Sequence, residues 1–196
     1  MNRKILFLQS TINKTNTTMI NIKKATEKDI PLINRMAWIA FPATYKDILK
    51  KEQIDYMMEW MYSPANILKQ MNEEGHIYYI AYKQTGSDTE TGAEGEEKPV
   101  GYVSIQKEGE DLFHLQKIYV LPEYQKEHAG KALFMHAVSE IRAINGKPCR
   151  MELNVNRNNT ALGFYMHMGM TKASEGDFDI GNGYFMNDYI MSLNID

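Results

Sequence analysis

The sequence predicts an α/β (α+β) protein, with a mixed, mainly antiparallel, twisted sheet of roughly six to seven strands and helices on both faces. Segments with strand periodicity outnumber the helices that could connect them, which favours a mixed sheet over a parallel one. The 196 residues are 43% hydrophobic and 24% charged, which is typical of a globular protein and excludes a disordered or fibrous one. The apolar runs fall far short of the roughly 20 residues that a membrane-spanning helix needs.

The first half of the chain begins with a strand and continues into helices. Thr26 is positioned to cap a helix whose apolar residues repeat with helical spacing, and Pro42 is expected to end it because proline lacks a backbone donor. Two segments of β-branched and aromatic residues then indicate a hairpin. In order, we expect a strand at 20–23, helices at 27–41, at 54–61 and from 64 to about 71, and strands at 76–82 and 100–105.

The segment 84–98 between the hairpin strands is rich in glycine, threonine and acidic residues, and we expect it to project as a mobile loop. An acidic lure for a substrate is the alternative interpretation. After this segment, strands are expected at 112–120, 150–155, 170–173 and 188–193, and helices at about 129–145 and 159–168.

Charge and cysteine content restrict the partners. The chain has 22 Lys and Arg against 25 Asp and Glu, a net charge of −3, and it lacks the basic runs of a nucleic-acid-binding protein. Cys149 is the only cysteine, so it can form neither an intramolecular disulfide nor a cysteine-based metal cluster. We therefore expect a cytoplasmic protein without nucleic acid, membrane or metal partners. Residues 1–18 are expected to be an N-terminal extension, and 19–196 a single domain.

A turn between a strand and a helix is the first candidate site. After the strand that ends at Val120, the segment 125–131 leads into an amphipathic helix. The first N–H groups of a helix have no partner within it and lie at its positive end, so they can bind an anion. Gly130 permits close approach of a ligand, and Lys126 and Lys131 add positive charge, which suits a pyrophosphate. The alternative is a plain strand-to-helix turn.

A second motif follows at 154–161, where asparagines precede a short helix. The pattern places Asn158 at the start of that helix and Tyr165 on it, beside Phe164. Gly169 is expected to end the helix.

Together the two motifs resemble the GNAT superfamily of acetyl-CoA-dependent N-acetyltransferases. That family has Q/R-x-x-G-x-G/A after a V-x-P strand end, and later N-x-x-A-x-x-F-Y-x-x-x-G-F. The order, the strand and helix context and the spacing are similar over about 112–170. The resemblance implies a GNAT-like fold, acetyl-CoA as co-substrate without a metal, and transfer of the acetyl group to an amine.

One position departs from the family pattern. His128 stands where the family usually has its first glycine, whereas Gln125 and Gly130 are kept. The His128 side chain could crowd the pyrophosphate, donate a hydrogen bond to it, or remain an exposed turn residue. The affinity for the cofactor depends on which of these holds.

Other segments are similar to the bacterial spermidine/spermine N-acetyltransferase branch. This similarity implies a small primary amine as acceptor, with a polyamine as first candidate, and Asp177 and Asp179 are expected in a loop where they could pair with distal ammonium groups. The similar segments are 41–45, 52–62, 177–181 and 188–189. Core packing is the interpretation that helical spacing favours for Trp38, Met57, Met58, Trp60 and Met61.

The resemblance also implies which residues carry out each step of acetyl transfer. Backbone groups of Ile118 and Val120 would hold the pantetheine arm and polarise the thioester, and Tyr165 would protonate the departing thiolate. A packed helical tyrosine is the alternative for Tyr165. The implied cofactor contacts are Ile118, Tyr119, Val120, Gln125, Lys126, Glu127, His128, Ala129, Gly130, Lys131, Asn158, Ala161 and Tyr165.

Several residues are candidates for the base that accepts the proton of the amine. His114 and Gln116 share a face of their strand by alternation, and Glu152 lies on the next strand. Each could act directly or through water, and His114 and Glu152 join Tyr165 as the predicted catalytic residues. Cys149 has no base near it in sequence and is expected to be inert.

The expected partners are acetyl-CoA and a small amine, and a homodimer is left open. Three other functions remain alternatives: a CoA-binding GNAT-like regulatory module with little turnover, an acetyltransferase acting on a protein N-terminus or lysine, and an unrelated phosphate-binding α/β domain.

Overall fold

A single seven-stranded sheet organises the computed structural model, which describes residues 19–85 and 96–196. Its strand order is β1-β2-β3-β4-β5-β7-β6, and all neighbours are antiparallel except β4 and β5. The predicted mixed, mainly antiparallel sheet is therefore confirmed. The strands are β1 (Ile20–Lys24), β2 (His76–Thr85), β3 (Glu96–Lys107), β4 (Leu112–Val120), β5 (Cys149–Asn156), β6 (Thr171–Gly181) and β7 (Tyr184–Ile195).

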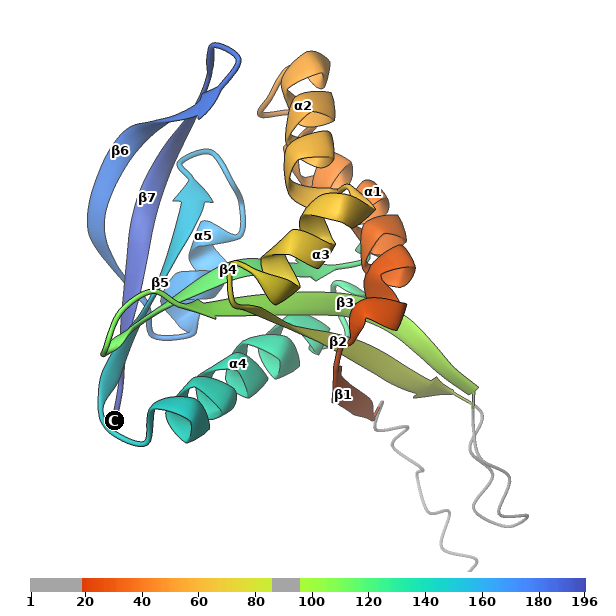
Figure 1. Cartoon of the computed structure of the whole chain (residues 1–196), viewed down its shortest axis with the longest axis vertical. Helices are drawn as coiled ribbons and strands as arrows, with labels where there is room; N and C mark the ends of the chain where they lie inside the picture. The colour runs from red at the N-terminus through yellow and green to blue at the C-terminus, as the bar shows by residue number, and fades with distance from the viewer. Residues whose placement is uncertain (1–18, 86–95) are drawn as a thin grey trace, which may run out of the picture.

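Helices cover both faces of the sheet (Figure 1). On one face, three helices pack over β2 to β4 around a core that includes Phe41, Met58 and Tyr102. On the other face lies a second core, in which Phe134 and Phe164 make an edge-to-face contact at 6.0 Å between ring centroids. The first group is α1 (Ile30–Tyr45), α2 (Lys51–Tyr62) and α3 (Pro64–Asn72), and the second is α4 (Ala129–Asn145) and α5 (Leu162–His167).

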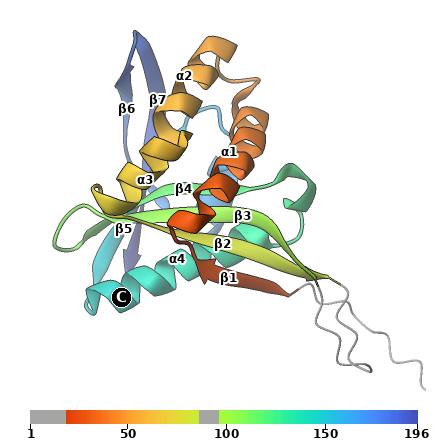
Figure 2. The same ribbon diagram turned by 45° about the vertical axis from the view of Figure 1, so that its right-hand side comes forward.

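The two halves of the sheet separate beyond the start of β4 (Figure 2). β4 and β5 pair in parallel only where Leu112–His114 lie beside Arg150–Glu152. Beyond these residues, β4 remains bonded to β3, and β5 remains bonded to β7. The edges of β4 and β5 that face each other are consequently left without a strand partner over the rest of their length.

Pro42 does not end the first helix, and that expectation was wrong. The helix continues to Tyr45, where the N–H of Lys46 donates to the carbonyl of Pro42 at 2.9 Å and Thr44 Oγ1 donates to the carbonyl of Ala40 at 2.8 Å. Phe41 and Tyr45 are both buried one turn apart. Packing of this last turn in the core outweighs the donor that proline lacks.

Several segments expected in loops are strands. The two ends of the predicted loop at 84–98 pair with each other, Gln84 opposite Glu97 and Thr85 opposite Glu96, and only 86–95 fall outside the described residues. β6 is much longer than 170–173, so Asp177 and Asp179 lie in a strand instead of a loop. Cross-strand hydrogen bonding to β7 overrides the low strand propensity of these acidic residues.

The two tryptophans are not core residues. Trp38 is 48% exposed and Trp60 is 47% exposed, whereas Met57 and Met58 are buried as expected and Met61 is partly buried. Trp60 lies on the outer side of α2, where its ring stacks on Tyr56 at 6.3 Å. Helical spacing identified the buried side of α2 but not the width of the buried stripe. Among the described residues, no helix combines the length and apolarity needed to cross a membrane.

Candidate active site

The separation of β4 from β5 opens a cavity with a volume of about 940 Å³. Its walls include residues 115–120 of β4, 153–155 of β5, the end of α1, the start of α4 and residues 164–167 of α5 in part. Strand edges that lack a partner strand present backbone N–H and C=O groups, which an extended amide-containing ligand can pair with. The fold therefore supplies a cleft suited to a long, polar, chain-like molecule.

Part of the wall of this cavity is formed by the turn predicted to bind an anion. A short 3₁₀ turn, Pro122–Tyr124, leads to His128, which has a left-handed backbone (φ 63°), and α4 begins at the next residue. Among the described residues, the N–H groups of His128, Ala129, Gly130 and Lys131 have no hydrogen-bond acceptor. Four free donors at the positive end of a helix of 17 residues can bind an anion.

The backbone of His128 explains why a glycine is usual at this position. A left-handed conformation is free of strain for glycine and uncommon for other residues, histidine being among the better tolerated ones. The His128 side chain is exposed and contributes to the cavity wall, so it lies within the region that an anion would occupy.

The packing of the protein does not require a glycine at position 130. A Cβ built on Gly130 would meet Val120 at 3.8 Å and Phe164 at 3.9 Å, which are ordinary contacts, and the residue has no positive φ. The fold alone would thus accept alanine here. The space over Gly130 belongs to the cavity, where it permits a ligand to approach the backbone.

A β-bulge in β4 turns Lys117 toward the helices. Ser104 pairs with Lys117 but the next residue, Ile105, pairs with Leu115, so Gln116 is an extra residue in β4. Leu115 therefore packs in the core beneath α4, while Lys117 lies on the side of α1 to α3. Simple alternation along the strand could not predict this change of side.

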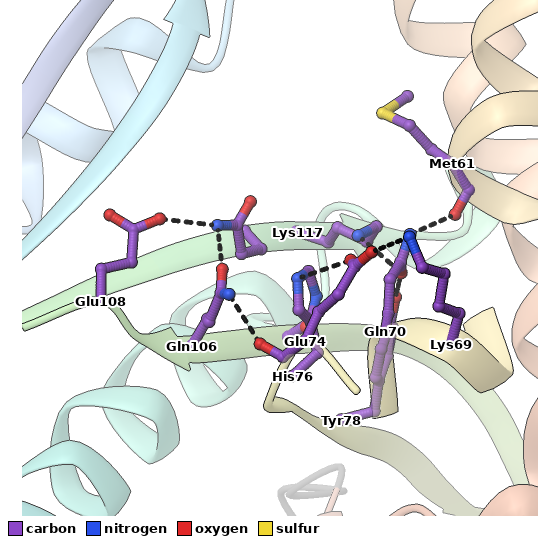
Figure 3. A network of polar contacts seen from close by, with 11 residues as sticks. Met61, Lys69, Gln70, Glu74, His76, Tyr78, Gln106, Glu108 and Lys117 are labelled. Carbon is purple, nitrogen blue, oxygen red and sulfur yellow. Dashed lines mark hydrogen bonds and ion pairs between the residues drawn. The ribbon is translucent and has the colours of Figure 1, made fainter. Parts of the chain in front are cut away.

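The ammonium group of Lys117 is buried in a polar network beneath α3 (Figure 3). Its Nζ donates to Gln70 Oε1 at 3.1 Å and lies 5.7 Å and 5.6 Å from the ring centroids of Tyr62 and Tyr78. Tyr78 also donates to Gln70 Oε1, at 2.5 Å. Burial lowers the pKa of Lys117 to about 7, because the charged form is poorly solvated there. No pattern in the sequence indicated that Lys117 would be buried.

Tyr165 lies in the wall of the cavity. It is 8% exposed, and burial raises the pKa of its phenol, so the hydroxyl is protonated at neutral pH. Tyr45 from α1 and Tyr119 from β4 also line the cavity, and the proximity of Tyr45 raises the pKa of Tyr165 further. Three phenols from three separate elements thus converge on one region.

The predicted helix start at Asn158 is displaced. α5 begins only at Leu162, because Asn156 Oδ1 accepts from the N–H of Asn158 at 3.0 Å and Asn159 Oδ1 accepts from the N–H of Ala161 at 2.9 Å. Two consecutive turns of this kind compete with helix formation. They leave the side chain of Asn158 exposed on the cavity wall. Gly169 ends α5 with a left-handed backbone (φ 92°), as expected.

Most, but not all, of the predicted ligand contacts lie together. Glu127 faces away from the cavity and pairs with Lys83 at 2.7 Å, and Ala129 is buried beneath the turn. The cavity wall contains Ile118, Tyr119, Val120, Gln125, Lys126, His128, Gly130, Lys131, Asn158, Ala161 and Tyr165.

The structure separates the candidate bases. Gln116 is in the cavity wall, whereas His114 and Glu152 are not among the residues that form it. His114 Nδ1 lies 3.6 Å from Glu108 Oε2, and burial lowers the pKa of its imidazole; Glu152 accepts from Arg150 Nε at 2.9 Å. Cys149 is buried at the opposite end of β5, and burial raises the pKa of its thiol.

Comparison with known families agrees with the architecture. The model of the acetyltransferase (GNAT) domain matches residues 49–179, more than half of the chain. The chain therefore belongs to the GNAT acetyltransferase family, and its class of activity is acyl transfer. A comparison with curated protein sequences finds no match.

Solved structures share the fold at low sequence identity. The PaiA N-acetyltransferase from Thermoplasma acidophilum, solved with coenzyme A, is 20% identical with a TM-score of 0.62, covering 89% of this chain and 98% of its own. The ribosomal-protein-S18-alanine N-acetyltransferase from Escherichia coli is 18% identical with a TM-score of 0.61, covering 90% and 94%. Mutant forms of the spermidine/spermine N-acetyltransferase SpeG from Vibrio cholerae are 14% identical with a TM-score of 0.57, covering 90% and 95%.

Proposed function

We propose that the protein transfers the acetyl group of acetyl-CoA to a primary amine of a small molecule, with a polyamine as first candidate. The observation that carries this proposal is the cavity between β4 and β5, whose wall includes both the turn with free N–H donors and Tyr165. Its volume of about 940 Å³ lies at the upper end of the range for small-molecule sites. A cytoplasmic location, where acetyl-CoA and polyamines occur together, belongs to the same proposal.

Acetyl-CoA would bind along the open edge of β4. The backbone of Ile118 and Val120 faces the gap left by β5 and can pair with the amides of the pantetheine arm. The pyrophosphate would bind at the four free N–H groups that begin at His128, with Lys126 and Lys131 neutralising its charge. Asn158 lies on the opposite wall and can contact the cofactor from there.

Tyr165 is the proposed general acid. A thiolate leaving group needs a proton as the C–S bond breaks, and a phenol held in its protonated form by burial can supply it. The phenols of Tyr45 and Tyr119 also line this cavity, whose wall is partly polar and partly apolar. Of the three predicted catalytic residues, the cavity wall contains Tyr165 but neither His114 nor Glu152.

The polyamine proposal is supported by the resemblance to the spermidine/spermine branch and by acidic residues on β6. Asp177 is exposed, but it already accepts from Arg157 at 3.0 Å and from Asn187 at 2.8 Å. Asp179 Oδ1 accepts from the N–H of Gly181 at 2.8 Å. A distal ammonium group would therefore compete with bonds within the protein. Acetylation of a protein N-terminus is the second candidate, favoured by the structural similarity to the alanine N-acetyltransferase.

A CoA-release assay with purified protein tests the proposed function. Polyamines, amino acids, aminoglycosides and N-terminal peptides are supplied in turn with acetyl-CoA, and we expect the largest kcat/KM for spermidine or spermine. Reaction with peptides alone would transfer the proposal to the second candidate. Tight binding of acetyl-CoA with no acceptor in the series would favour a regulatory module in which His128 modifies the anion site.

A further inference from the structure

A buried carboxylate with an unpaired oxygen lies beside the cavity. Asp188 on β7 is 5% exposed, and its Oδ2 accepts from Asn154 Nδ2 at the long distance of 3.4 Å. Its Oδ1 is buried and has no hydrogen-bond partner among the described residues. Buried polar atoms are almost always paired in native proteins, so an unpaired carboxylate oxygen indicates a missing partner.

Asp188 lies on the same side of the sheet as the end of α1. Met186, two residues earlier on β7, packs in the core beneath α1 to α3, so Asp188 faces that side as well. The Asp188 carboxylate contributes to the raised pKa of Tyr45, although burial is the main cause. Tyr45 and Asn154 both form part of the cavity wall. Asp188 therefore lies beside the cavity, in contact with the wall residue Asn154, without being part of the wall itself.

The neighbouring cation does not neutralise Asp188. Arg157 stabilises its charge from a distance, but the guanidinium donates to the carbonyl of Gly176 and to Asp177 Oδ1, each at 3.0 Å. Burial outweighs the influence of Arg157 and of the Asn154 contact, and raises the pKa of Asp188 to about 6. At neutral pH the group is mostly a carboxylate without a directly bonded cation.

We propose that Asp188 receives the ammonium group of the acceptor where Asn154 now covers it, beside the cavity, and removes one of the ammonium protons. The inference rests on the proposed function and deepens it by assigning the base. An ammonium group is a stronger donor to a carboxylate than the amide of Asn154, whose exposed side chain is free to turn aside. Asp188 binds the positive charge first and then accepts the proton, so it selects a protonated amine as acceptor.

The step balances with groups already described. Asp188 takes a proton from R–NH₃⁺, and the lone pair of the resulting amine forms the C–N bond with the thioester carbonyl carbon. The C–S bond breaks, and the CoA thiolate takes a proton from Tyr165. The nitrogen of the new amide then gives its excess proton to the Tyr165 phenolate, which restores the phenol and completes the amide. Asp188 loses its proton to solvent.

Asp188→Asn tests the inference, because it keeps the shape and removes both the charge and the basicity. Asp111→Asn is the matched control, since Asp111 is an exposed carboxylate paired with Lys147 outside the cavity. With the best acceptor of the series, we expect kcat/KM to fall about 10²-fold or more in Asp188→Asn and to remain unchanged in the control. The Kd for acetyl-CoA should stay within about twofold in both, because its proposed anion site is on another element.

The pH profile separates a base from a structural residue. In the wild type, kcat/KM should rise with pH through about 6, the pKa of Asp188, and this limb should be absent in Asp188→Asn. The groups that face Asp188, namely Tyr45, Asn154 and Arg157, do not titrate in that range. An unchanged acidic limb, or full activity in Asp188→Asn, would overturn the inference while the proposed function stands.

If Asp188→Asn does not fold, an NMR titration of the wild-type protein still tests the inference without requiring turnover. Carboxyl ¹³C NMR on the wild-type protein saturated with CoA can follow the titration of Asp188 with and without butylamine. Binding of the ammonium group should lower the pKa of Asp188 by about one unit. No change on adding butylamine contradicts the inference. Failure of every amine to be acetylated, together with this shift, would contradict the proposed function alone.

Discussion

Replacing Lys117 by methionine should stabilise the protein at neutral pH. Lys117 is 6% exposed, and the pKa of its ammonium group falls from 10.5 to about 7 because burial removes water from the charge. Methionine has a similar length, no charge, and a thioether that packs favourably against the rings of Tyr62 and Tyr78. Gln70 Oε1 would keep its hydrogen bond from Tyr78 after the substitution, so no acceptor is orphaned.

The size of the effect follows from linkage between protonation and folding. Between pH 7 and pH 10 the unfolded chain binds more protons at Lys117 than the folded protein does, so the free energy of unfolding of the wild type rises with pH. The pKa difference corresponds to about 4 kcal/mol of destabilisation at pH 7, of which about half is relieved by pH 9. Loss of the hydrogen bond to Gln70 reduces the net gain from methionine to about 2–3 kcal/mol at pH 7.

Urea unfolding of the wild type and of Lys117→Met at pH 7, 8 and 9 measures this difference. Methionine should give the more stable protein at pH 7, and its advantage should shrink by about 2 kcal/mol by pH 9. Comparing the two proteins at each pH cancels the contributions of the other titrating groups. A variant that is less stable at pH 7, or a difference that does not depend on pH, would refute the reasoning that burial depresses the pKa of Lys117.

Two further predictions concern catalysis and a tight contact. Tyr165→Phe should lower kcat by about 10²-fold and leave the Kd of acetyl-CoA nearly unchanged, because it removes the proton donor and keeps the ring. A variant that keeps the wild-type rate in single-turnover kinetics would show that Tyr165 only packs in the wall. Gly181→Ala should destabilise the protein by about 2–3 kcal/mol in thermal unfolding, since φ is +88° and a Cβ would lie 2.6 Å from Tyr56 Oη. Gly183→Ala, at φ +74° with open space, should cost only about 1 kcal/mol, and equal losses in the two variants would contradict the steric argument.

The order of strands and helices was predictable because local patterns determine it. The strand, turn and helix around 112–145 carry a clear apolar periodicity, and the structure has them where expected, as β4 and α4. Helix and strand ends were less predictable, because tertiary packing decides them. Pro42 stays inside α1 since Phe41 and Tyr45 are buried one turn apart, and β6 extends through acidic residues since β7 pairs with it.

The candidate site was likewise predictable where local sequence patterns determine it and unpredictable where tertiary structure does. The residues of the turn and of Tyr165 belong to contiguous motifs, so their grouping could be read from the sequence. Lys117 could not be found in this way, because a single extra residue in β4 changes the side on which it lies. Asp188 is 23 residues from Tyr165 in the chain, and its relation to the cavity depends on the pairing of β7 with β5. Non-local strand pairing of this kind leaves no pattern in a single sequence.

Isothermal titration of acetyl-CoA into the wild type and Gly130→Asp tests most directly whether the cavity and its turn bind the cofactor. The wild type should bind one equivalent, and Gly130→Asp should raise the Kd by about 10²-fold or more, because a carboxylate would then face the pyrophosphate at the free N–H groups. Gly109→Asp is the matched control, outside the cavity wall, and it should bind as the wild type does. Equal affinity in the folded Gly130→Asp protein would contradict the account.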